Sequence, residues 1–228
     1  MAASPGEQLL RLVGVMDRLR SPGGCPWDAE QTHDSLATYL LEETYETLEA
    51  IDSGDRVHLR EELGDLLLQV VFHARIATEH PDDPWTIDDV AADISDKLVR
   101  RHPHVFGDAT ARSAAHVEAA WDRLKAEEKQ RTSALDGIPA ALPALSLATK
   151  TIGRAERADV GVPLPPSPLD APADDAAPDE NAVGDALMAL VAHARAGGVD
   201  PEQALRRAVA RYADQVRRRE TGVVDEPT

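Results

Sequence analysis

Four acidic side chains have the spacing of a metal site built on two helices. Glu43 and Glu46 are three residues apart, and so are Glu62 and Asp65. Residues three apart share one face of a helix, so each pair would point in a single direction. Oxygen ligands of this kind bind hard divalent cations. The two pairs therefore predict a site for Mg²⁺, with Mn²⁺ as the substitute ion.

The turn between the two segments decides whether the pairs meet. A hairpin that folds at Gly54 brings Glu46 level with Glu62, roughly 12 Å from the turn at about 1.5 Å per residue. The same hairpin brings Glu43 level with Asp65, roughly 16 Å from the turn. Apolar residues border these positions in both segments. Four carboxylates in a partly dry seam repel one another, and a bound cation or protonation relieves that repulsion.

The acids have two other interpretations. In the first, they form solvated helix faces that pair with Lys or Arg, as acids at this spacing commonly do. The mirror register of the two pairs disfavours this interpretation but leaves it open. A di-iron carboxylate bundle needs a Glu-x-x-His pattern. The positions three after Glu46 and Asp65 are Glu49 and Leu68, so the pattern is absent.

Basic and aromatic residues further along the chain suit a nucleotide. Lys97 and Arg101 are four apart, with Arg100 beside them, and Trp121 and Lys125 repeat the spacing. An aromatic ring one turn from an ammonium group suits a base and a phosphate. Basic residues at helix ends also complement the helix dipole, so they indicate a nucleotide site only in combination with the four acids.

The elements that position these residues are predicted to be helices. Apolar residues recur with helical periodicity, Gly and Pro interrupt the pattern between segments, and no strand pattern is present. The fold class is all-α. The predicted helices of this part of the chain cover residues 6–20, 32–51, 57–78, 86–101 and 113–130.

The last third of the chain differs in composition. Residues 159–180 contain six prolines and six acidic residues but no Lys or Arg, as expected of a flexible linker. Two helices are predicted after it, over 184–196 and 201–219. The predicted organisation is a catalytic helical domain at 1–130, a connecting segment at 131–158, the linker at 159–180, a helical hairpin at 181–220 and a tail at 221–228.

Composition excludes several classes of protein. The 228 residues carry a formal net charge of −17, which argues against a protein that clamps nucleic acid. The longest charge-free stretch, residues 137–149, is too short for a membrane span, and no secretory signal is recognised at the start. A single cysteine, Cys25, fits a reducing cytoplasm, and we interpret it as a packing residue.

Together these motifs closely resemble the MazG nucleoside triphosphate pyrophosphohydrolases. The resemblance is strong from Leu9 to about Lys129 and weak beyond. It is carried by the following runs: Gly24-Cys25-Pro26-Trp27-Asp28, Gln31-Thr32-His33, Leu41-Glu42-Glu43-Thr44-Tyr45-Glu46, Glu61-Glu62-Leu63-Gly64-Asp65 and Arg101-His102-Pro103-His104-Val105-Phe106.

The resemblance implies a MazG-like helical bundle that acts as a homodimer and a Mg²⁺-dependent enzyme that cleans the nucleotide pool. Such an enzyme cleaves a nucleoside triphosphate between the α and β phosphates. The implied metal ligands are Glu43, Glu46, Glu62 and Asp65, and Glu42 is the implied residue that orients or deprotonates the attacking water. The implied nucleotide contacts are Lys97, Arg101, Trp121 and Lys125.

The second half departs from the family pattern. Gly184-Asp185 is similar to Gly64-Asp65, but Ala182 stands where the first half has Glu62. The hairpin at 181–220 is therefore interpreted as a degenerate second domain without a metal site. This feature keeps one alternative open, a nucleotide-binding regulatory module with little turnover. A second alternative is a related pyrimidine triphosphatase or phosphoribosyl-ATP pyrophosphohydrolase.

Overall fold

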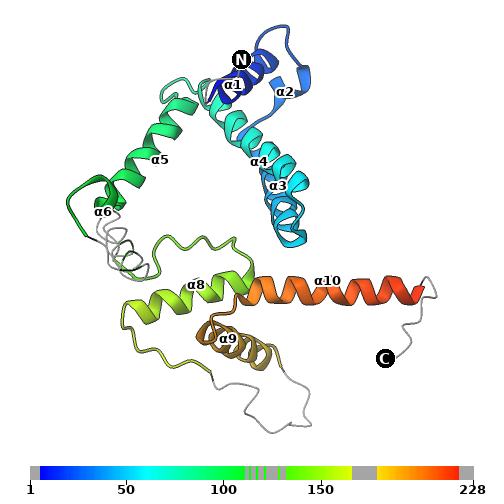
Figure 1. Ribbon diagram of the computed structural model, residues 1–228, viewed down its shortest axis with the longest axis vertical. Coiled ribbons are helices and arrows are strands. Elements are labelled where there is room, and N and C mark those ends of the chain that lie inside the picture. The colour runs from blue at the N-terminus through cyan, green and yellow to red at the C-terminus, as the bar shows by residue number, and fades with distance from the viewer. Residues whose placement is uncertain are drawn as a thin grey trace. The chain divides into compact units, whose positions relative to one another are not determined.

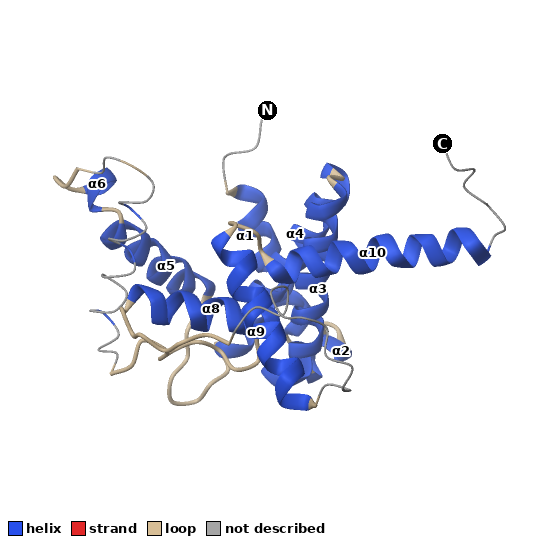
Figure 2. Cartoon of the chain, turned by 90° about the horizontal axis from the view of Figure 1, so that it is seen from below, coloured by secondary structure: helices blue, strands red, loops and turns tan. Residues whose placement is uncertain are grey.

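The computed structural model describes residues 6–110, 113, 117, 121, 128, 132–165 and 179–220. Within these residues every regular element is a helix and no strand is present, which confirms the all-α prediction (Figure 2). The chain divides into two compact units, residues 1–121 and 122–228. None of the described helices is long and apolar enough to cross a bilayer.

The first unit is built on a long helical hairpin. Helices α3 (His33–Ser53) and α4 (Arg56–Ala77) lie side by side, as Figure 1 shows. Gly54 ends α3 with a φ of 71°, a left-handed conformation that glycine adopts without strain. Asp55 begins α4 by accepting hydrogen bonds from the backbone N–H groups of Val57 and His58, at 2.8 and 3.1 Å. The turn predicted at Gly54 is therefore present.

The core of this unit lies at the end of the hairpin away from Gly54. Helix α1 (Glu7–Arg20) packs against α4, and the buried side chains come from α1, the start of α3 and the end of α4. Helix α2 (Pro26–Glu30) follows α1 and was not predicted from the sequence. The fully buried cluster consists of Met16, Leu36, Val71 and Phe72.

Arg20 ties the end of α1 to the rest of the unit. Its Nη1 donates to the carbonyl oxygens of Asp28 and Gln31, at 2.6 and 2.9 Å. Its Nε and Nη2 donate to the carboxylate of Glu79, each at 2.9 Å. One side chain therefore fixes the α2 segment against the end of α4.

Helix α5 (Ile87–Arg101) begins with a capping box formed by Thr86 and Asp89. It starts next to the end of α4 and runs away from the α3–α4 hairpin (Figure 1). His102-Pro103 ends it, as predicted, and the short α6 (Pro103–Phe106) follows. The predicted helix over 113–130 falls largely outside the described residues.

The second unit contains three described helices. Helix α8 (Ala144–Arg157) lies in the predicted connecting segment, residues 131–158, and it packs on α9 (Glu180–Ala196). Helix α10 (Pro201–Glu220) follows the turn at Gly197 and Gly198, close to the predicted bounds. Residues 166–178 of the predicted linker and residues 221–228 lie outside the described part of the chain.

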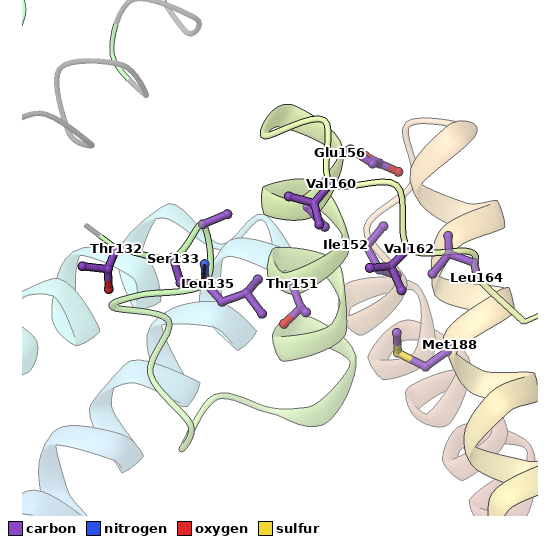
Figure 3. A pocket seen from close by; sticks show the side chains of 12 residues that line it. Thr132, Ser133, Leu135, Thr151, Ile152, Glu156, Val160, Val162, Leu164 and Met188 are labelled. Atoms are coloured by element: carbon purple, nitrogen blue, oxygen red, sulfur yellow. Dashed lines mark hydrogen bonds between the residues drawn. The ribbon is translucent and has the colours of Figure 1, made fainter. Parts of the chain in front are cut away.

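A pocket of about 520 Å³ opens in this second unit (Figure 3). Most of its lining side chains are aliphatic, among them Leu135, Ile152 and Val160, and Met188 of α9 and Glu156 of α8 also line it. None of the described residues of the predicted acid and nucleotide sites lines it.

Candidate metal and nucleotide site

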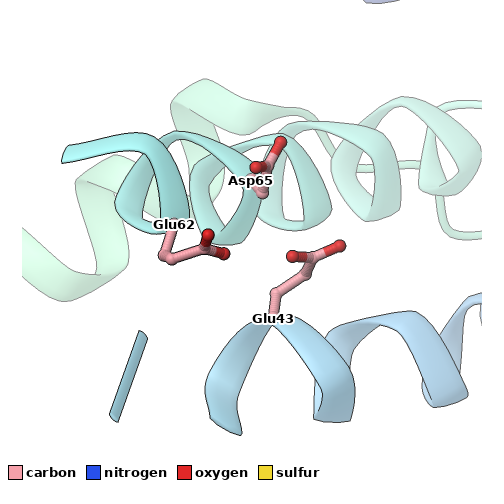
Figure 4. A group of neighbouring side chains, drawn as sticks. All are labelled: Glu43, Glu62 and Asp65. Carbon is pink, nitrogen blue, oxygen red and sulfur yellow. The ribbon is translucent and has the colours of Figure 1, made fainter. Parts of the chain in front are cut away.

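Three of the four predicted metal ligands converge between α3 and α4. Glu43 of α3 and Glu62 and Asp65 of α4 each offer a carboxylate oxygen, and these oxygens lie within 4.8 Å of one another. Figure 4 shows Glu43 and Glu62 pointing into the space between the two helices, with Asp65 next to them on α4. The hairpin register predicted from Gly54 places them there. We call this group the acid cluster.

Glu46, the fourth predicted ligand, lies outside the acid cluster. It is exposed on α3, one turn from Glu43. Its negative charge nevertheless contributes to raising the pKa of Glu43, so the two carboxylates interact. A change of side-chain rotamer is the kind of movement that would bring Glu46 to a cation held by the other three.

Burial of Glu43 is the main reason that the pKa of its carboxyl group is raised above 4.5. The charges of Asp65, Glu46, Glu62 and Glu42 raise this pKa further, in that order. Burial and like charge both disfavour the carboxylate, and both are offset when a cation binds. The electrostatics of the site therefore favour a divalent ion.

Glu62 is the most buried member of the acid cluster, with 7% of its surface exposed. Its Oε1 lies 2.9 Å from Nε2 of His58, whereas its Oε2 is buried without a hydrogen-bond partner among the described residues. A buried carboxylate oxygen without a partner loses its hydration and gains nothing in return. The donor set therefore fits a hard cation bound to oxygen, which would take this position.

Three polar residues one helical turn from the acid cluster were not predicted as part of the site. His58 is four residues before Glu62, Thr47 four after Glu43 and Gln69 four after Asp65, so helical spacing was the signal that would have found them. Thr47 Oγ1 and Gln69 Oε1 are buried without a partner in the described residues, as Glu62 Oε2 is. Polar atoms thus continue from the acid cluster along the hairpin in both directions.

Two of the predicted nucleotide-binding residues meet at the end of α5. Arg101 is 6% exposed, and its guanidinium carbon lies 5.6 Å from the centroid of the Trp121 ring. The His102 ring approaches the same tryptophan edge-on, at 4.8 Å between centroids. Lys97 is half-buried on α5, and Lys125 lies outside the described residues.

Glu42, the residue implied to act on the attacking water, is exposed on α3. Its charge contributes to the raised pKa of Glu43. Helix α5, which carries Lys97 and Arg101, runs away from the α3–α4 hairpin (Figure 1).

A second polar feature of the first unit joins α3, α4 and the loop before α5. Nδ1 of His33 and Nδ1 of His73 are 2.7 Å apart, and the two rings are parallel with centroids at 5.0 Å. Trp85 stacks near His33, at 6.5 Å. This ring stack was not predicted, because His33 entered the prediction only through the Gln31-Thr32-His33 motif.

Comparisons with known proteins match the part of the chain that contains the acid cluster. Residues 31–106 match the MazG nucleotide pyrophosphohydrolase domain, a range that contains α3, α4 and the acid cluster. A protein from Thermotoga maritima named nucleoside triphosphate pyrophosphohydrolase/pyrophosphatase MazG is 40% identical over 220 residues, which cover 92% of the chain and 84% of the relative.

Two further relatives also align with almost all of the chain. A Mycobacterium tuberculosis protein named nucleoside triphosphate pyrophosphohydrolase is 44% identical over 212 residues, covering 93% of the chain and 58% of the relative. An uncharacterised 26.1 kDa protein from Streptomyces cacaoi is 51% identical over 216 residues, covering 93% of the chain and 83% of the relative.

Proposed function

Because the chain belongs to the MazG nucleotide pyrophosphohydrolase family, we propose that it hydrolyses nucleoside triphosphates at the acid cluster with the aid of Mg²⁺. The products are a nucleoside monophosphate and pyrophosphate. Mn²⁺, which also accepts oxygen ligands, is the substitute ion. Removal of surplus or aberrant triphosphates is the proposed role.

One observation carries the proposal of a metal at this place. Three carboxylates converge within 4.8 Å, and the most buried of them keeps one oxygen without a hydrogen-bond partner in the described residues. A surface that merely solvates its acids would leave them in water or pair them with Lys or Arg. Glu62 instead contacts His58, with Nε2 and Oε1 2.9 Å apart.

The residues proposed to hold the ion are Glu43, Glu62 and Asp65, with Glu46 completing the set. The bound cation would draw negative charge from the phosphate oxygens and lower the pKa of a coordinated water. Glu42, next to Glu43 on α3, is proposed to orient the attacking water or to accept its proton. The water oxygen bonds to phosphorus as the anhydride bond between the α and β phosphates breaks, and the leaving phosphate takes the electron pair.

Lys97, Arg101 and Lys125 are proposed to bind the triphosphate, and Trp121 to stack on the base. Arginine and lysine neutralise the charge that grows on phosphate oxygens during the reaction. The contact of Arg101 with the Trp121 ring supports a shared binding surface for base and phosphate.

We further propose a homodimer formed through the α3–α4 hairpin. Leu63, Leu67 and Val70 follow one another at helical spacing on α4, and all three are exposed in the single chain. An apolar face of this kind is normally covered, and a second hairpin supplies a matching face in a four-helix bundle. The proposed location is the cytoplasm, where Cys25 stays reduced.

Product analysis tests the proposal. The protein is incubated with each common nucleoside triphosphate with and without Mg²⁺, and monophosphate and pyrophosphate are quantified. Glu62→Gln removes the charge of a proposed ligand and is expected to lower turnover by at least a hundredfold. Glu61→Gln is the matched control, because Glu61 is exposed and adjacent on the same helix.

Pyrophosphate formation that requires both Mg²⁺ and Glu62, and that survives in Glu61→Gln, supports the proposed reaction and site together. Full turnover in Glu62→Gln would show that the metal lies elsewhere. Binding of nucleotide without turnover across the panel would instead indicate a regulatory module.

A further inference from the structure

Helix α10 carries an apolar stripe that the described residues of its own unit leave uncovered. Leu205, Val209, Tyr212 and Val216 are 54%, 58%, 69% and 39% exposed, respectively. Pro201, the first residue, is the only buried residue of the helix, and α10 then extends away from α8 and α9 (Figure 1). The stripe residues are four, three and four apart, which is the spacing of the seam in a two-stranded coiled coil.

The stripe is complementary to itself in one orientation. Two copies of α10 placed antiparallel, with the midpoint between Ala210 and Arg211, set Leu205 opposite the partner's Val216. The same placement sets Val209 opposite the partner's Tyr212. Each apolar residue then meets an apolar residue of the other copy, as a two-fold symmetric contact requires.

The charged residues at the two ends of the seam fit the same orientation. Continuing the repeat by one step in each direction reaches Glu202 and Arg219. In the antiparallel pair Glu202 lies level with the partner's Arg219 at both ends, so opposite charges close the seam. A parallel pair would place glutamate against glutamate and arginine against arginine, which is unfavourable.

The flanks of the seam also allow two helices to approach. Ala208 and Ala213 border the stripe, and small side chains reduce the distance between helix axes. Glu202 already pairs with Arg206 within the helix at 2.7 Å, so the partner's Arg219 would approach a carboxylate that Arg206 shares. Arg207 and Arg211 lie on the outer face of the proposed pair, where they stay in water.

We propose that α10 associates in antiparallel orientation with α10 of a second copy of the chain through Leu205, Val209, Tyr212 and Val216. A pair of 20-residue helices is about 30 Å long, so the contact is smaller than a standard protein interface. It therefore supplements a larger contact between copies, and it does not depend on the proposed hydrolysis. This gives the degenerate second unit a role in assembly.

Disulfide trapping in the full-length chain tests the register. All variants carry Cys25→Ser, which removes the native thiol. A tagged copy with Val209→Cys is co-expressed with an untagged copy with Tyr212→Cys, and the mixed disulfide is quantified after mild oxidation. The matched control combines Ala210→Cys with Arg211→Cys, because these residues are level in the same register but lie on the outer face.

The proposal expects at least tenfold more mixed disulfide for the 209/212 pair than for the 210/211 pair. It also expects the mixed product to form faster than the disulfide of either variant with itself. Equal trapping in the two pairs, or trapping that is as fast in Val209→Cys alone, would overturn it. Protection of the thiol introduced by Val209→Cys from a thiol reagent, without a mixed disulfide, would overturn it as well, because another occupant would then cover the stripe.

A charge placed in the seam provides a second readout. Val209→Glu is expected to raise the dissociation constant of the dimer about tenfold in a dilution series followed by sedimentation equilibrium, whereas Arg211→Glu on the outer face leaves this constant unchanged. Helical content is measured for both variants, so that loss of folding is separated from weaker association. An unchanged dissociation constant in a folded Val209→Glu protein would contradict the proposal.

Discussion

His58 and Glu62 lie one turn apart on α4, with Nε2 of the imidazole 2.9 Å from Oε1 of the carboxylate. The other oxygen of Glu62 is buried without a hydrogen-bond partner among the described residues. The imidazole therefore contacts one oxygen of the carboxylate and leaves the other for a cation. Groups that hold a metal ligand in this way orient it and affect metal affinity, although they do not touch the ion.

Removal of the imidazole is expected to weaken metal binding. In His58→Ala, the Mg²⁺ concentration that gives half-maximal activity should rise about tenfold, because Glu62 loses the contact that orients it. The rate at saturating Mg²⁺ should change less. A Mg²⁺ titration of initial rates measures both quantities.

His58→Gln keeps a donor at this position and should recover part of the affinity, which a purely structural role would not predict. Arg60→Ala, at an exposed position on the same helix, serves as the control. An unchanged Mg²⁺ requirement in His58→Ala would show that the contact does not position Glu62.

The second prediction concerns repulsion within the acid cluster. Burial and the neighbouring carboxylates raise the pKa of Glu43, so its charged form destabilises the metal-free fold at neutral pH. Glu43→Gln removes that charge and should raise the melting temperature in EDTA. Activity should be lost in the same variant. Glu49→Gln, exposed on α3, should change neither property.

Added Mg²⁺ should reverse the order of the two proteins. The wild-type chain should gain stability because the ion binds the folded state, whereas Glu43→Gln should gain little. If Glu43→Gln melts below the wild-type chain in EDTA, Glu43 contributes a stabilising contact and the carboxylates do not repel as described.

The parts of the site that follow from local spacing were predictable from the sequence. Three-residue spacing and the position of Gly54 were enough to bring Glu43 to Asp65, because helix rise is nearly constant. The contact of Arg101 with Trp121 was not predictable in this way, because it joins residues 20 apart across a turn. The four-residue helical spacing predicts a pairing of Trp121 with Lys125 instead.

Helix α8 was missed for a related reason. Its residues 144–157 follow a stretch with two prolines and few charges, which is typical of a connecting segment. Ile152 of α8 is buried together with Ala189 and Val191 of α9. Only the tertiary structure shows that α8 covers one side of α9.

The third prediction tests the proposed nucleotide surface. Trp121→Ala removes the ring next to Arg101 and should raise KM for the triphosphate about tenfold, with a smaller effect on kcat. Trp121→Phe retains an aromatic face and should lie between the two. Steady-state kinetics on one nucleotide, with melting temperatures for all three proteins, decide the outcome. A lower melting temperature with an unchanged KM would mean that Trp121 only packs.

The fourth prediction is a pH dependence of stability from His73. The pKa of this imidazole is lowered from 6.5, first because burial disfavours the charged ring and second because of the charge on His33. In the unfolded chain the pKa returns to its ordinary value. Below about pH 6.5 the His73 imidazole binds a proton more readily in the unfolded state than in the folded state. The free energy of unfolding therefore decreases as pH falls.

Chemical unfolding at a series of pH values between 8 and about 5.5 measures this effect above the range in which ordinary carboxylates titrate. His73→Gln cannot take up the proton and should show a flatter profile than the wild-type chain across this range. His193→Gln, at an exposed position on α9, should keep the wild-type slope. Because His33 and His73 share one 2.7 Å contact, His33→Gln should also flatten the profile in part, since it removes the charge that opposes protonation of His73. Parallel profiles for wild-type and His73→Gln proteins would place the proton uptake at other histidines and contradict the prediction.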